Sequence, residues 1–258
     1  MKMYIADAFT EEVFSGNPAA VCVMDTWMSD DKMQAVAAEN NLSETAFIVK
    51  EGDDYHIRWF TPQYEIDLCG HATLASAFII DNYIESDRKI INFKSQSGNL
   101  QVACRDGFYT LNFPSRPPER IEKIKEVEEA LGAEIKELFS SRDLMAVVEN
   151  EDIVRNLTPN FDKIKELSIG DGIIVTAAGS DCDFVSRCFY PKCGVNEDPV
   201  TGSAHCNLIP YWAERLEKTE MTARQLSQRG GVLYCRDCKE RIEISGRAVI
   251  YAISEIFI

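Results

Sequence analysis

The stretch Cys69-Gly70-His71-Ala72-Thr73 follows an apolar segment that ends at Pro62, and it opens a run of small residues typical of a helix. The stretch Thr201-Gly202-Ser203-Ala204-His205 follows Phe189-Tyr190-Pro191 in the same order. The offset is 129 residues between the prolines (62 and 191) and 132 between the glycines (70 and 202), so the second loop is three residues longer. Such a repeat predicts two similar lobes facing a cleft. Two helix N-termini meeting there would form a pocket for an anion.

Composition sets limits on what the chain can be. Its 258 residues are 45% hydrophobic and 27% charged, which is ordinary for a globular protein of one large domain or two smaller ones. The net charge of −15 argues against nucleic-acid binding, which depends on Lys and Arg at phosphates. No apolar run is long enough to span a membrane, and the first residues are typical of a strand rather than a signal peptide. The nine irregularly spaced cysteines indicate a reduced, cytoplasmic protein.

Hydrophobic periodicity predicts an α+β first lobe over residues 1–113. A Gly16-Asn17-Pro18 turn is expected between the first two strands, and Ser29 is expected to cap a helix that ends near Asn40. The helix that begins at residue 70 is apolar on nearly every side and is therefore expected to be buried. The expected strands are 4–8, 19–24, 45–49, 55–60, 89–93, 98–104 and 108–113.

Three prolines at positions 114, 117 and 118 indicate a linker, so the second lobe is expected over 114–258. A helical period through Ile121, Ile124, Val127 and Leu131 predicts a helix that stops at Gly132. A short helix is expected near residue 159 and a second buried helix over 202–216. The expected strands are 172–177, 183–190, 231–235, 240–245 and 248–258, the last of which could pair with the N-terminal lobe.

Five motifs resemble, in order, those of the phenazine-biosynthesis PhzF-like family. They extend from residue 7 to residue 231, which is nearly the whole chain. A single pentapeptide would be weak evidence, whereas five in the family's order are specific. The motifs are Asp7-Ala8-Phe9-Thr10 with Phe14-Ser15-Gly16-Asn17-Pro18, Asn41-Leu42-Ser43-Glu44-Thr45-Ala46-Phe47, Cys69-Gly70-His71-Ala72-Thr73, Asp198-Pro199-Val200-Thr201-Gly202-Ser203-Ala204-His205 and Ser227-Gln228-Arg229-Gly230-Gly231.

The resemblance implies a diaminopimelate-epimerase-like fold, in which two pseudo-symmetric lobes each curl a mostly antiparallel sheet around a central helix. It also implies a cofactor-free isomerase, commonly a homodimer, that acts on a small carboxylate-bearing molecule. In the founding enzyme a glutamate moves a proton along a dihydro-hydroxyanthranilate ring. Matched to this chain, the catalytic residues are Glu44, His71, Asp198 and Ser203, and the substrate-binding residues are Gly70, Ala72, Gly202 and Ala204.

Each candidate also has a purely structural interpretation. Glu44 could be a solvated carboxylate at a helix end, or a base whose pKa rises by burial in a cleft. His71 and Ser203 could cap helices, or could hydrogen-bond substrate while the helix amides grip its carboxylate. Asp198 could be an exposed turn residue, or could orient a substrate amine. The family resemblance favours the functional interpretation of all four.

Cys69 raises a different possibility. Related epimerases and proline racemases place a cysteine before the glycine in both lobes, so that one thiolate removes the α-proton and the other thiol donates one. Here the second position is Thr201, which does not ionise near neutral pH, and Cys206 lies too far along the helix. A two-thiol racemase is therefore disfavoured, and Cys69 is expected to be a small packed residue. A racemase using Cys69 with another partner and a catalytically silent binding protein both stay open.

The sequence gives little support for a metal or a nucleotide. Cys235-Arg236-Asp237-Cys238 has the spacing of half a zinc site, but no second pair follows it. No glycine-rich phosphate loop precedes a helix, so neither NAD nor ATP has an evident binding motif. We therefore expect no metal and no cofactor.

Overall fold

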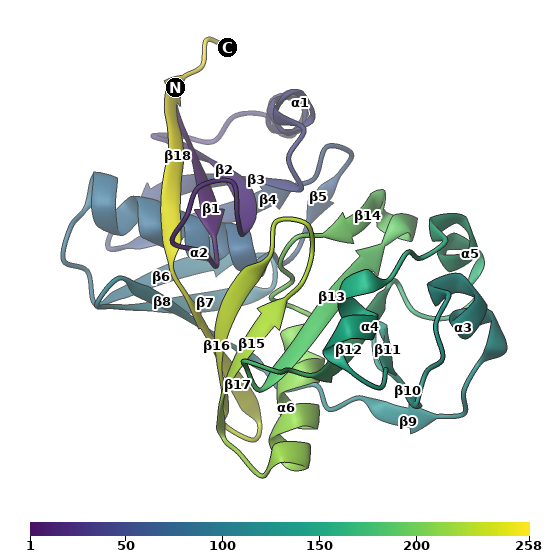
Figure 1. Cartoon of the computed structure of the whole chain (residues 1–258). Coiled ribbons are helices and arrows are strands. Elements are labelled where there is room, and N and C mark those ends of the chain that lie inside the picture. Colours follow the sequence, from purple (N-terminus) through teal and green to yellow (C-terminus); the bar gives the residue numbers. More distant parts are fainter. The chain divides into compact units, whose positions relative to one another are not determined.

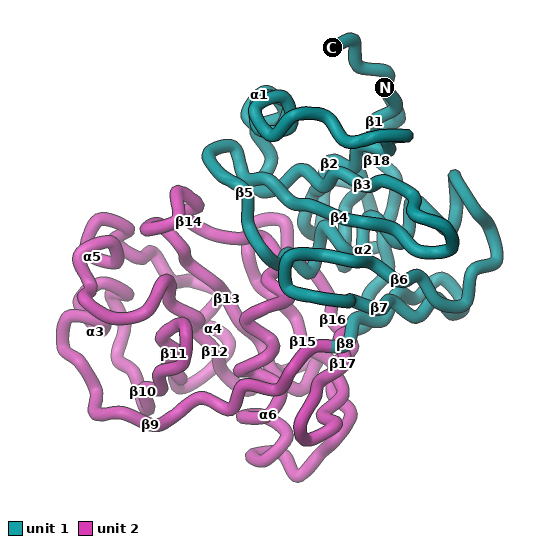
Figure 2. Tube along the Cα trace, turned by 180° about the vertical axis from the view of Figure 1, so that it is seen from behind, with its two compact units in different colours: residues 1–112, 245–258 teal, residues 113–244 magenta.

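A computed structural model describes residues 1–258. The chain divides into two compact units, which Figure 2 colours separately. Unit 1 comprises Met1–Asn112 and Ser245–Ile258, and unit 2 comprises Phe113–Ile244. Each unit is a mixture of strands and a few helices (Figure 1).

Unit 1 is a single sheet in the order β18-β1-β2-β3-β4-β6-β7-β8. Two neighbouring pairs, β2–β3 and β4–β6, are parallel, and the others are antiparallel. The elements are β1 (Lys2–Ala8), β2 (Asn17–Met24), α1 (Asp30–Asn40), β3 (Glu44–Glu51), β4 (Asp54–Phe60), β5 (Glu65–Ile66), α2 (Gly70–Ile79) with a π-helical turn at Ile80–Ile84, β6 (Ile90–Ser95), β7 (Gly98–Arg105), β8 (Phe108–Pro114) and β18 (Ala248–Glu255).

The sheet of unit 1 curls around α2. The helix contacts β18 and β1 near one end of the strand order and β7 near the other, which a flat sheet would not allow. Every residue of α2 except Phe78 is buried. The small residues of this helix let strands approach it from several sides, and two hydroxyls bond back to the helix instead of needing water. Thr73 Oγ1 donates to Cys69 O at 2.5 Å, and Ser76 Oγ donates to Ala72 O at 2.7 Å.

Unit 2 has a sheet in the order β9-β10-β11-β12-β13-β15-β16, with β11–β12 and β13–β15 parallel. Its helices divide between the two faces of this sheet. The elements are β9 (Glu119–Ile121), α3 (Lys125–Leu131), β10 (Glu137–Ser140), β11 (Leu144–Val147), α4 (Glu151–Asn156), α5 (Phe161–Glu166), β12 (Ile173–Ala178), β13 (Phe184–Tyr190), a 3-10 turn (Pro191–Cys193), β14 (Val195–Asp198), α6 (His205–Leu216), β15 (Glu220–Gln225), β16 (Gly231–Asp237) and β17 (Arg241–Gly246).

Alternation along β12 shows how the two faces are used. Thr176 accepts a hydrogen bond from Trp212 Nε1 of α6 at 2.9 Å, so its side chain faces the buried helix. The neighbouring Val175 and Ala177 belong instead to a hydrophobic cluster with residues of α3, α4 and α5. Phe184 of β13 stacks on the Trp212 ring with 5.8 Å between centroids. Thus α6 fills one face of the sheet and the three short helices cover the other.

Several predicted boundaries were wrong. Ile121 lies on β9, and the helix expected to include it begins only at Lys125. Ile121 has the same apolar spacing as Val127 and Leu131, although it belongs to a different element. The helix expected from residue 202 begins at His205. Asn17 begins β2 rather than lying in a turn before it. Strands β5, β10, β11, β14 and β15 and helix α4, each of six residues or fewer, were not predicted.

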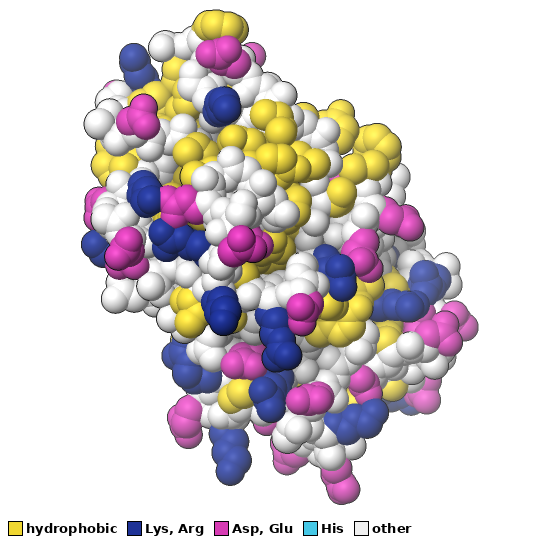
Figure 3. All heavy atoms as spheres, turned by 90° about the vertical axis from the view of Figure 1, so that its left-hand side faces the viewer, with side chains coloured by type: hydrophobic (Ala, Val, Ile, Leu, Met, Phe, Trp, Pro, Cys, Tyr) yellow, Lys and Arg dark blue, Asp and Glu magenta, His cyan; other side chains and the backbone are white.

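Apolar side chains are exposed along β18 of unit 1. Tyr251 and Ile253 are each 54% exposed, and Tyr251 forms an edge contact with the exposed Phe14 ring at 5.8 Å. Figure 3 shows an apolar area on the upper part of the face viewed there. Membrane-spanning helices are not found in this chain, since no helix is long and apolar enough.

Candidate active site

The first candidate cluster lies in unit 1, where α2 and β3 begin. Glu44 is the first residue of β3, and its side chain is 16% exposed. His71 is the second residue of α2, and its side chain is only 4% exposed. Cys69 immediately precedes α2 in extended conformation and is buried. Because α2 packs against β2 and β3, the polar groups at its N-terminus lie beside the N-terminal ends of these two parallel strands.

The His71 ring lies between three polar side chains. Its Nε2 is 3.2 Å from Glu44 Oε2, within ion-pair distance, although the N–H is not aligned with the oxygen as in a good hydrogen bond. Its Nδ1 is 3.2 Å from Asn17 Nδ2 and 3.5 Å from Cys69 Sγ. Asn17 is fully buried at the start of β2. A base, an imidazole, an amide and a thiol are therefore gathered in one place.

Asn17 determines the tautomer of His71. An amide nitrogen can only donate, so Nδ1 must accept from Asn17 and carries no proton. In a neutral ring the proton then lies on Nε2, the nitrogen that faces Glu44. Burial in turn lowers the pKa of His71 from 6.5 to about 3, so the ring is neutral at neutral pH. The nearby carboxylate favours the charged ring, but desolvation of the fully buried ring outweighs it.

The N-terminus of α2 offers further donors. No side chain caps this helix, so the amides of Gly70, His71 and Ala72 are not satisfied by a cap. Helix N-termini attract anions through these amides and the helix dipole. The purely structural alternative, in which His71 caps α2, is not seen, because no side chain caps this helix and the His71 ring lies beside Asn17.

The second cluster lies in unit 2, in the loop between β14 and α6. Thr201 Oγ1 donates to Asp198 Oδ2 at 2.6 Å. The buried side chain of Gln225 holds this loop by three bonds. It accepts from Thr201 N at 2.8 Å and donates to Asp198 O at 2.7 Å and to Thr201 Oγ1 at 3.1 Å. Gln225 was missed in the sequence because it lies at the end of β15, two residues before the motif that begins at Ser227 and outside every quoted motif.

Ser203 lies in the turn before α6 rather than in the helix. His205 N bonds to Gly202 O, Cys206 N to Ser203 O and Asn207 N to Ala204 O, each at 3.1 Å. These bonds span three residues, so a tight 3-10-type turn precedes the first regular helical bond, which Leu208 N makes to Ala204 O. This turn is why the helix begins three residues later than expected. Ser203 is half-buried, and its hydroxyl makes no hydrogen bond within the molecule.

The two repeats share one hydrogen bond. In unit 1, Thr73 Oγ1 donates to the carbonyl oxygen of Cys69. In unit 2, His205 Nδ1 makes the equivalent bond to Thr201 O at 2.8 Å. In each repeat the acceptor is the carbonyl oxygen of the residue just before the motif glycine. The donor is the side chain four residues further along the chain. The match supports the repeat assigned from sequence at the level of individual atoms.

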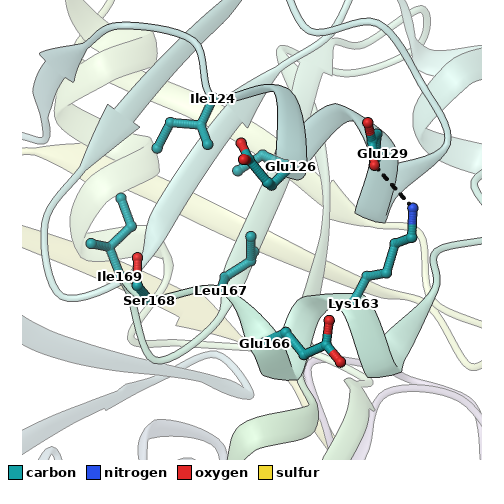
Figure 4. A pocket seen from close by; sticks show the side chains of 9 residues that line it. Ile124, Glu126, Glu129, Lys163, Glu166, Leu167, Ser168 and Ile169 are labelled. Atoms are coloured by element: carbon teal, nitrogen blue, oxygen red, sulfur yellow. Dashed lines mark hydrogen bonds and ion pairs between the residues drawn. The ribbon is translucent and has the colours of Figure 1, made fainter.

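The Cys235/Cys238 pair and a surface hollow in unit 2 are less suited to catalysis or metal binding. Cys235 is buried and bonds to its own strand, whereas Cys238 is exposed, and no group of potential metal ligands includes either. A hollow of about 460 Å³ beside α3 and α5 is lined by Ile124, Leu167, Ile169 and charged side chains (Figure 4). Its one internal ion pair joins Lys163 and Glu129 at 3.1 Å, and no buried titratable group points into it.

Comparison with known proteins identifies the family of this chain. The family model described as "Phenazine biosynthesis-like protein" (PhzC-PhzF) matches residues 6–253. An uncharacterized isomerase of Pseudomonas aeruginosa is 47% identical over 99% of this chain and 98% of its own length. A crystal structure of a PhzF-family phenazine biosynthesis protein from Enterococcus faecalis superposes with a TM-score of 0.98, at 52% identity, over 100% of this chain and 99% of that one. A protein of P. aeruginosa described as a predicted epimerase has a TM-score of 0.77 at 17% identity, over 100% and 99% of the two chains, which supports the fold alone.

The fold and the matched motifs define an isomerase of the PhzF type with a diaminopimelate-epimerase-like fold. The chain belongs to the PhzC-PhzF, phenazine biosynthesis-like family. The resemblance read from the five motifs is therefore confirmed.

Proposed function

We propose that this isomerase is cofactor-independent and moves a proton between carbon atoms of a small carboxylate-bearing metabolite, with Glu44 as general acid and base. One observation carries the proposal. The partly exposed Glu44 carboxylate lies 3.2 Å from the buried Nε2–H of a neutral histidine. The carboxylate can reach a ligand, and the imidazole behind it is held in one protonation state and one tautomer.

The proton transfer needs only groups that the chain supplies. Glu44 takes a proton from an acidic C–H bond of the substrate, and the electron pair of that bond delocalises toward the adjacent unsaturated group. The protonated Glu44 then returns the proton at another carbon, so nothing is oxidised or reduced. His71 donates from Nε2 toward the carboxylate and orients it. Such contacts are often poorly aligned before substrate binds, as this one is.

The substrate carboxylate is proposed to bind at the N-terminus of α2. The uncapped amides of Gly70 and Ala72 supply donors there without a positive side chain. This suits a chain whose net charge is −15, because local dipoles must offset the unfavourable global field. Asp198, Ser203, Gly202 and Ala204 of unit 2 are proposed as further substrate contacts from the family motif, and the free hydroxyl of Ser203 supports its inclusion.

A second candidate is an amino-acid racemase or epimerase that uses Cys69. It is favoured by the 3.5 Å separation of Cys69 Sγ and His71 Nδ1, which places a thiol beside a nitrogen base. Against it, Nδ1 already accepts from Asn17. The equivalent residue in the second repeat is Thr201, which has a hydroxyl instead of a second thiol, and this hydroxyl donates to Asp198.

Proton NMR in D2O tests the proposal. The protein is incubated with amino acids, hydroxy acids and dihydro-hydroxyanthranilate, and deuterium uptake is followed at each carbon. Uptake that requires Glu44 supports the proposed isomerase. Uptake at an α-carbon that requires Cys69 supports the racemase. Thermal stabilisation by a carboxylate without any uptake supports a binding protein instead.

A further inference from the structure

Glu44, Cys69 and His71 also form the one group of three potential ligands in this chain whose donor atoms lie close enough together that they could hold a metal ion. One ligand atom from each lies within 4.8 Å of the other two. The set comprises a thiol, an imidazole and a carboxylate, which are the three donor types found around zinc in proteins. The group has no metal-site spacing in the sequence, because Glu44 lies 25 residues before Cys69.

The Cys69–His71 edge already has the dimensions of a zinc site. Zinc binds sulfur at about 2.3 Å and imidazole nitrogen at about 2.0–2.1 Å, so two such ligands in tetrahedral geometry are about 3.5 Å apart. The observed separation of Cys69 Sγ and His71 Nδ1 is 3.5 Å. Nδ1 accepts from Asn17 Nδ2 and carries no proton, so its lone pair becomes available to a metal ion once the Asn17 amide turns away.

Two neighbouring side chains would adjust. The Asn17 amide, now donating to Nδ1, would turn by half a rotation and present its oxygen to the ion. The Glu44 carboxylate would move from beside Nε2 to the open side of the ion. Glu44 lies at the start of a strand and is partly exposed, so its side chain has room to swing. A fourth position would be left for water or for a carboxylate ligand.

We propose that Cys69, His71 and Glu44 bind one Zn²⁺ or a similar borderline divalent cation, and that this cation inhibits the enzyme reversibly. Binding replaces the thiol proton with the metal, and that proton leaves to solvent. The ion occupies Glu44 and His71 together, so the base can no longer accept a substrate proton. The inhibition rests on the proposed function of Glu44, whereas the binding does not.

Cobalt titration tests the binding directly, since Co²⁺ takes the place of Zn²⁺ and a cobalt–thiolate bond absorbs in the near ultraviolet. The full chain is reduced, freed of metal and titrated with Co²⁺, and Zn²⁺ is then added to displace it. We expect one Co²⁺ per chain with a thiolate band. Cys69→Ser should remove the band, and His71→Gln should weaken binding at least tenfold. Glu44→Gln should weaken binding less and keep the band, because the sulfur and nitrogen ligands remain.

Cys238→Ser is the matched control, because Cys238 is an exposed thiol outside the cluster, and it should behave as wild type. Circular dichroism checks that each variant is folded, and Cys69→Ala serves as a second test of the thiol. A wild-type chain without a thiolate band at millimolar Co²⁺, or a band that survives both Cys69 substitutions, would overturn the proposal. Proton exchange is measured separately without metal. A failed cobalt titration therefore leaves the proposed role of Glu44 standing, and an absence of proton exchange leaves the proposed metal binding standing.

Discussion

Asn17 Nδ2 lies 3.2 Å from His71 Nδ1 and thereby places the ring proton on Nε2, the nitrogen that faces Glu44. Asn17→Asp would put an acceptor where the donor now lies and draw the proton to Nδ1. The bare Nε2 would then face the carboxylate. We expect kcat to fall about tenfold to 100-fold. KM should change little, because the backbone amides of α2 that are proposed to bind the substrate carboxylate are unchanged.

Nitrogen NMR of labelled histidine reads out the tautomer in this variant. Asn40→Asp is the control, since Asn40 donates to Thr45 Oγ1 in the same unit without contacting His71. A ring that keeps its proton on Nε2 in Asn17→Asp would show that Asn17 does not determine the tautomer.

His205 makes stability depend on pH. Burial lowers the pKa of His205 to about 4, below the 6.5 of the unfolded chain, although its bond to Thr201 O opposes the shift. Between these values the unfolded state binds more protons, so the free energy of unfolding falls as pH decreases from 6.5 toward 4. The slope from this residue is at most about 1.4 kcal/mol per pH unit.

The variant His205→Asn isolates this effect. Its amide can keep the donor to Thr201 O while removing the titrating ring. Urea unfolding at pH 7 and pH 5 should therefore show a smaller loss of stability in the variant than in wild type. An equal loss in both would contradict the assignment.

Gln225 should contribute more to stability than its single position in the sequence indicates. Gln225→Ala leaves the buried amide of Thr201 and the part-buried carbonyl of Asp198 without their partner. We expect a loss of about 2–4 kcal/mol in the free energy of unfolding, measured by urea titration. Gln228→Ala, three residues further along and exposed, should change the free energy by less than about 0.5 kcal/mol. A neutral Gln225→Ala would mean that the loop is held by other contacts.

Cys69→Ser separates the two candidate reactions. If Glu44 is the base, the serine variant should keep deuterium exchange within about a factor of ten of wild type, because the thiol neither removes nor donates a proton in that reaction. A racemase that uses the thiolate would lose exchange by a factor of about 100 or more, since serine does not ionise near neutral pH. The same substrate and the same NMR assay distinguish the two candidate reactions.

The sequence predicted the parts of the fold that have a long, clear period. The buried helix α2 and most strands of unit 1 were found, because apolar alternation and all-round apolar character are local signals. The start of α6 was not, because a 3-10 turn at Gly202–Ala204 has no distinct residue pattern. Ile121 was assigned to a helix because a strand end and a helix face can supply the same spacing.

The candidate site was predicted unevenly for a related reason. Glu44 and His71 lie in motifs and were identified, whereas Asn17 was taken for a turn residue and Gln225 was not singled out. Both amides act through tertiary contacts with residues of other elements or loops that are distant in the sequence, and local sequence cannot show these. Cys69 was predicted to be packed, and it is buried, but its place beside His71 Nδ1 emerged only from the structure.

The central claim is that Glu44 carries the proton, and deuterium exchange in Glu44→Gln tests it most directly. The variant keeps the size of the side chain and removes its basicity. Glu51→Gln, at the other end of β3, is the matched control. We predict that one carboxylate-bearing compound exchanges with wild type and with Glu51→Gln, and at least about 100-fold more slowly with Glu44→Gln. Exchange at the wild-type rate in Glu44→Gln would contradict the account.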